Sequence, residues 1–81
     1  MEIKELEAKI EAILFTMGEA VEADRIAIAL EQDVSVIRNI LRNMMIEYKE
    51  SSRGVQIIEL NDSFQMCTKP DMYEYIIRVA H

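Results

Sequence analysis

The stretch RGVQIIELNDSFQMCTKP, residues 53–70, decides the fold of this 81-residue chain. Residues 55–60 are mostly β-branched and apolar, and residues 64–68 alternate Phe, Met and Thr with Gln and Cys. Asn61, Asp62 and Ser63 lie between these two runs and are residue types that favour turns. Two strand-like runs joined by so short a turn predict a β-hairpin.

Upstream of the hairpin, the sequence predicts three helices. Apolar residues recur every three or four positions within residues 3–17, 23–31 and 34–49, the spacing that places them on one helix face. Gly18 suits the left-handed residue that ends the first helix, and Asp33 suits the N-cap of the third. Residues 20–21 leave room only for a short strand. The residues expected to face inward are Ile3, Leu6, Ile10, Ile13, Leu14, Met17, Ile26, Ala27, Leu30, Ile37, Ile40, Leu41, Met44 and Tyr48.

Downstream of the hairpin, Pro70 suits the first turn of a final helix, where its missing N–H is not needed. Met72, Tyr75, Ile76 and Val79 give this helix an apolar stripe, and Met72 is expected in the core. Three helices with a short strand, then a hairpin wing and a C-terminal helix, are the winged-helix arrangement of the α+β class, and a plain α+β domain is the alternative. We therefore expect residues 1–81 to form a single winged-helix domain.

Charge and composition limit the possible partners. The formal net charge is −6, so the chain on average repels nucleic-acid phosphates and anionic membrane surfaces. The N-terminus is charged from its second residue and has no apolar run of the signal-peptide type. Cys67 is the only cysteine, which excludes an internal disulfide and fits a reducing compartment. A cytoplasmic domain is the expectation.

Residues that could carry chemistry are few and scattered. His81, the single histidine, stands at the end of the sequence, and Cys67 has no base or cation beside it in sequence to form a thiolate. Gly18 and Gly54 are too far apart for a phosphate-binding loop. We expect no catalytic, cofactor-binding or metal-ligating residues, no small-molecule substrate and no enzyme activity.

Two phrases, LEAKIEAILFTMGEAV at residues 6–21 and RGVQIIELNDSFQMCTKP at residues 53–70, carry a family resemblance. With the two helices between them, they resemble the first domain of the segregation and condensation protein B family. The resemblance implies a bacterial protein with two tandem winged helices, of which the second is missing here. It implies homodimers that bind the kleisin subunit of a structural-maintenance-of-chromosomes complex, which condenses and segregates chromosomes in the cytoplasm at the nucleoid.

The first helix is apolar on two faces, and two interpretations fit. Ala8, Ala12 and Phe15 lie roughly opposite the inward stripe. Either the helix is sandwiched within the domain, or these residues contact another subunit. Ile46 and Ile58, which are also off-pattern, are further candidates for a dimer or partner contact.

The third helix offers an alternative function, that of a sequence-specific DNA-binding transcription regulator. Opposite its core face it carries arginine and asparagine, which can read guanine and adenine edges in the major groove. The hairpin tip, however, has no Lys or Arg, and a solvated polar face explains the pattern as well, so no direct DNA contact is expected. The candidate DNA contacts under this alternative are Arg38, Asn39, Arg42, Asn43 and Lys49.

Overall fold

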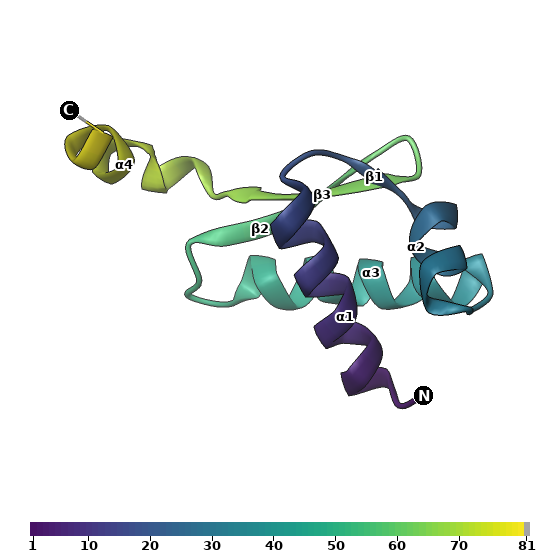
Figure 1. Cartoon of the computed structure of the whole chain (residues 1–81). Helices are drawn as coiled ribbons and strands as arrows, with labels where there is room; N and C mark the ends of the chain where they lie inside the picture. The colour runs from purple at the N-terminus through teal and green to yellow at the C-terminus, as the bar shows by residue number, and fades with distance from the viewer. Residues whose placement is uncertain (81) are drawn as a thin grey trace.

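The computed structural model describes residues 1–80, and His81 lies outside the described residues. The chain forms three helices, a hairpin and a final helix, with a two-residue strand before the second helix, which confirms the predicted winged-helix order (Figure 1). The elements are α1 Ile3–Met17, β1 Val21–Glu22, α2 Ala23–Leu30, α3 Val34–Glu50, β2 Val55–Leu60, β3 Ser63–Thr68, a 3-10 helix Pro70–Met72 and α4 Tyr73–Ala80.

The sheet is antiparallel with the strand order β1-β3-β2, so the hairpin's second strand is central. Val21 pairs with Phe64 and Leu60 pairs with Ser63. This leaves Asn61 and Asp62 as a two-residue turn, one residue shorter than the three turn formers of the sequence. Their φ values of 49° and 63° are both left-handed, the conformation of a type I′ hairpin turn that asparagine and aspartate tolerate.

The helices end close to the predicted positions, but one expected capping hydrogen bond is not formed. Gly18 ends α1 with a φ of 67°, and its N–H donates to the Leu14 carbonyl at 3.3 Å. Glu31 adopts a left-handed φ of 55°, so α2 ends at Leu30 and not at Glu31. Asp33 stands at the N-cap of α3, but its side chain makes no capping hydrogen bond, so the N-cap position is right and the expected side-chain bond is missing.

The core lies where α1, α2 and α3 meet the inner face of the sheet. Leu6, Ile10 and Leu14 enter it from α1, and Phe64, fully buried, enters it from the central strand. All five inward residues predicted on α3 are buried: Ile37, Ile40, Leu41, Met44 and Tyr48. Periodicity thus predicts the buried face of α3 correctly, whereas the predicted inward residues Ile13 of α1 and Leu30 of α2 are only half-buried.

Three expectations of burial are wrong. Ile3 and Met17 are exposed, because they lie in the end turns of α1 while its covered residues are in the middle. Met72 is only half-buried, and the stripe of α4 is exposed at Tyr75, Ile76 and Val79. The reason is that α4 extends away from the three-helix body at one end of the molecule, which measures 43 × 21 × 21 Å (Figure 1).

Candidate interaction site

The outer face of α1 is open to solvent, so the sandwiched interpretation of this helix is wrong. The Phe15 side chain is 77% exposed, and Ala8 and Ala12 are exposed as well. Leu6, Ile10 and Leu14 of the same helix are buried, so one helix contributes both to the core and to an outer apolar face. An exposed phenylalanine beside small residues leaves a shallow hollow that a second protein can fill.

The hollow beside Phe15 is built from α1, α3, β2 and β3 and from the segment that links α3 to β2. We call it the Phe15 hollow, and its lining residues are Glu11, Ala12, Phe15, Tyr48, Arg53, Val55 and Met66. Ala8 lies one turn earlier on α1 and lines a neighbouring, more polar depression. The structure therefore brings Ala12 and Phe15 together at one site and places Ala8 at its border.

Tyr48 lines the Phe15 hollow and contacts two of the other lining residues. Its hydroxyl donates a hydrogen bond to the Glu11 carboxylate, and the Arg53 guanidinium lies 4.8 Å from the centre of its ring. Burial, and next the hydrogen bond to Glu11, raise the pKa of Tyr48 to about 12. Sequence periodicity placed Tyr48 in the core but gave no sign of this contact, since Glu11 and Arg53 are distant in sequence.

Ile46 and Ile58 line a second hollow, between α3 and β2. Ile46 is 55% exposed and Ile58 is half-buried. The hollow is completed by Met45, Lys49, Gln56, Ile57 and Glu59. It shares no residue with the Phe15 hollow, so Ile46 and Ile58 lie on a different surface from Ala12 and Phe15.

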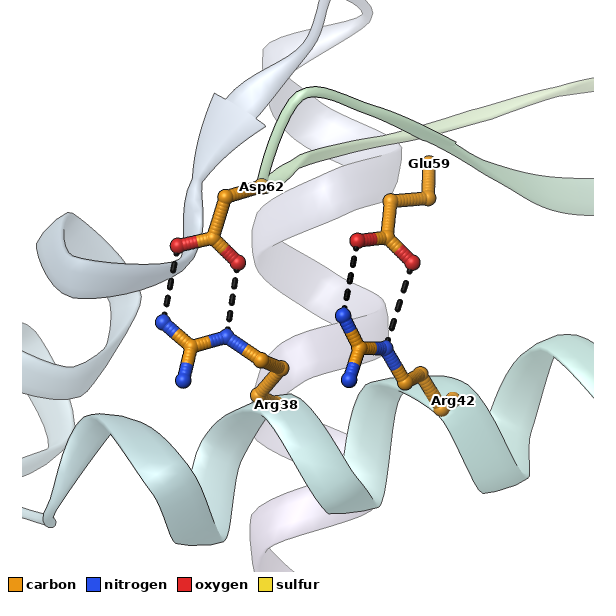
Figure 2. A network of polar contacts seen from close by, with 4 residues as sticks. All are labelled: Arg38, Arg42, Glu59 and Asp62. Atoms are coloured by element: carbon orange, nitrogen blue, oxygen red, sulfur yellow. Dashed lines mark hydrogen bonds and ion pairs between the residues drawn. The ribbon is translucent and has the colours of Figure 1, made fainter.

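The arginines of α3 are held by the chain's own hairpin. Arg38 pairs with Asp62 through two hydrogen bonds of 2.7 and 2.8 Å, and Arg42 pairs with Glu59 through two of 3.2 and 3.0 Å (Figure 2). These hydrogen bonds lower the pKa of Asp62 and of Glu59 and raise the pKa of both arginines.

These ion pairs change the interpretation of the α3 face. Each arginine binds its carboxylate in bidentate fashion, through the same planar guanidinium group that would contact a guanine edge. Asn39 and Asn43 remain exposed, and Lys49 lies at the hollow that contains Ile46. Sequence reasoning missed the pairs, although the spacing of Arg38 and Arg42 by four and the acids in and beside the turn were visible signals.

Other kinds of site find no support among the described residues. Residues 1–80 hold no group of three or more His, Cys, Asp or Glu side chains that could bind a metal ion. In the same part of the chain no helix combines the length and apolarity needed to span a bilayer. Cys67 lies half-buried in β3, as expected, with a free thiol.

The fold and these surfaces together define a winged-helix domain with exposed apolar faces and with the arginines of α3 paired within the chain. Residues 8–81 match the model of the family described as "Segregation and condensation complex subunit ScpB". The chain belongs to this family.

Curated relatives carry the name segregation and condensation protein B. The protein of Lachnoclostridium phytofermentans is 65% identical over 81 residues, which are all of this chain and 43% of that protein. The protein of Agathobacter rectalis is 54% identical over 74 residues, which are 90% of this chain and 40% of that protein. The chain thus spans less than half the length of these relatives.

Two solved structures share the fold. One is described as a dimer of the ScpB N-terminal domain complexed with a ScpA peptide. It aligns with a TM-score of 0.88 at 26% identity, over 95% of this chain and 96% of that one. The other, ScpB from Mycobacterium tuberculosis, aligns with a TM-score of 0.93 at 25% identity, over 99% of this chain and 50% of that one.

Proposed function

We propose that this chain is a non-enzymatic subunit of a bacterial condensin-like complex, which condenses and segregates chromosomes through homodimerisation and kleisin binding. Family membership supports the complex, and the solved relative described as a dimer with a ScpA peptide supports both interactions. The observation in this chain that carries the proposal is the exposed Phe15 above its hollow. The protein acts in the cytoplasm at the nucleoid.

The two hollows are assigned to two kinds of contact. Phe15 and Ala12, with Ala8 at the border, contribute to self-association. Ile46 and Ile58 contribute to binding the kleisin, because their hollow is separate and stays open when the Phe15 hollow is covered. Residues 1–81 form the first of two winged helices, in keeping with the chain's 50% coverage of the Mycobacterium tuberculosis protein.

Sedimentation equilibrium across a concentration series, with and without a DNA duplex, tests this function. We expect a concentration-dependent dimer that does not bind the DNA duplex. Phe15→Ala should raise the dimer dissociation constant at least tenfold. Since Phe15 is exposed, this substitution should change the free energy of unfolding by no more than about 0.5 kcal/mol. A monomer at every concentration that shifts only with the duplex would support the regulator alternative instead.

Kleisin binding is tested separately by titration calorimetry with the purified kleisin subunit. Ile46→Ser should weaken binding while leaving dimerisation intact, and Phe15→Ala should show the opposite pattern. Equal loss of both interactions in either variant would contradict the assignment of two surfaces.

A further inference from the structure

The apolar stripe of α4 lacks cover in the single chain. No residue within Tyr73–Ala80 is buried, Val79 is 89% exposed and Ile76 is 43% exposed. Within the described chain the main contact of α4 is with the 3-10 helix that precedes it. An isolated helix of eight residues is too short to be stable in water, so its stability has to come from packing of this face.

The α4 stripe is continuous with the Phe15 hollow. Ile76 and Val79 line an almost wholly apolar groove with Gly54 and Val55 at the base of the hairpin. Val55 also lines the Phe15 hollow. Val55 thus connects the two apolar hollows, and Phe15 and Val79 lie at their exposed ends. Exposed apolar surface that continues over several elements is typical of protein contacts.

The segment before α4 is firmly attached to the hairpin base. The Lys69 backbone N–H donates to the Gly54 carbonyl at 2.8 Å, and the Lys69 ammonium donates to the Ser51 carbonyl at 2.8 Å. Met72 packs on Gly54, where a side chain added to the glycine would lie 3.4 Å from the Met72 Cγ. The α4 helix is thus an arm projecting from a fixed base.

We infer that the α4 arm of one copy packs into the Phe15 hollow of a second copy, and that the second copy's arm does the same in return. Each copy supplies one arm and one hollow, so a two-fold pair covers both and leaves neither open. The charges do not oppose this, because Glu74 on the arm is paired with Arg78 and the hollow's rim carries both Glu11 and Arg53. The inference rests on the proposed self-association and names the element that produces it.

Sedimentation equilibrium of an arm variant tests the inference. Ile76→Ser combined with Val79→Ser should raise the dimer dissociation constant at least tenfold. Ile28→Ser is the matched control, because Ile28 is 76% exposed on α2 and lines neither the groove nor the hollow. Circular dichroism of the monomeric variant should show the core fold unchanged.

The outcomes separate the inference from the proposed function. If the arm variant dimerises like the parent while Phe15→Ala does not, the arm is outside the contact and only the inference fails. If the parent chain is a monomer at every concentration, the proposed self-association fails as well.

Cysteine cross-linking distinguishes exchange between copies from an arm that folds back on its own hollow. In a Cys67→Ser background, one chain carries Ala12→Cys and a second chain carries Val79→Cys. Exchange predicts a mixed covalent dimer after mild oxidation, in higher yield than with Ile28→Cys in place of Ala12→Cys. An intramolecular disulfide in a chain bearing both cysteines, without mixed dimers, would overturn the inference.

Discussion

Gly18 ends α1 in the left-handed conformation, with a φ of 67°. A side chain added there would meet no atom within 4 Å, so its cost is backbone strain alone. Gly18→Ala should therefore lower the free energy of unfolding by roughly 1 kcal/mol, measured by chemical denaturation. Gly54→Ala is the control, because Gly54 has no positive φ and its added carbon would only touch Met72. Equal stabilities of the two variants would contradict the strain explanation.

Tyr48 makes the stability of the domain sensitive to alkaline pH. Its folded-state pKa is about 12, whereas an unfolded tyrosine titrates near pH 10. The stabilisation is therefore present below pH about 10 and is lost as the pH rises toward 12, by on the order of 1 kcal/mol per pH unit. Tyr48→Phe should flatten the curve of unfolding free energy against pH in this window. Parallel curves for parent and variant would contradict the assignment.

At the scale of elements, two ion pairs connect the hairpin wing to α3. Arg38 and Arg42 are neutralised by Asp62 and Glu59, which lie at and beside the hairpin turn. The combined variant Glu59→Gln with Asp62→Asn removes two negative charges and releases both guanidinium groups. It should bind duplex DNA more tightly than the parent at low salt, by fluorescence anisotropy, and lose that affinity as salt rises.

The experiment needs an intact turn and a control for net charge. Asn tolerates the left-handed conformation of position 62, so the turn itself is preserved. Replacing Glu50, an exposed acid at the end of α3, with Gln changes the net charge without releasing an arginine. A parent chain that binds DNA as tightly as the variant would show that the ion pairs do not mask the arginines.

The helices show how far a sequence pattern predicts structure. The spacing of apolar residues identifies the inner face of α3 correctly at every predicted position. The same kind of spacing on α4 identifies an apolar face that nothing in the single chain buries. Periodicity gives the side of a helix that avoids water, but the partner depends on where the chain carries the helix, which is a three-dimensional property.

The candidate contacts show the same limit at the level of the site. The angular position of Phe15 on α1 suggested an outer face, and its exposure agrees with that interpretation. The packing of α3 against β2 brings Ile46 close to Ile58 and pairs Arg42 with Glu59. These pairs are twelve and seventeen positions apart, and no short-range rule of spacing connects them.

At the scale of the whole molecule, net charge and apolar contact act in opposite directions. Two copies with a formal net charge of −6 each repel one another, and salt screens that repulsion. Self-association through Phe15 and the α4 arm should therefore strengthen between low and high sodium chloride in sedimentation equilibrium. Association that weakens with salt would indicate that ion pairs, and not apolar faces, hold the copies together.

Asp62 connects the hairpin turn to two helices. It occupies the hairpin turn, its carboxylate pairs with Arg38 on α3, and its backbone carbonyl accepts the N–H of Ala23 at the start of α2, at 2.9 Å. The tip of the wing is therefore tied to the helices on two sides. In amide hydrogen exchange, the Ala23 N–H should therefore exchange at the same rate as the β3 amides, because all of them become exposed in one cooperative opening. The turn of the wing thus protects the first amide of α2.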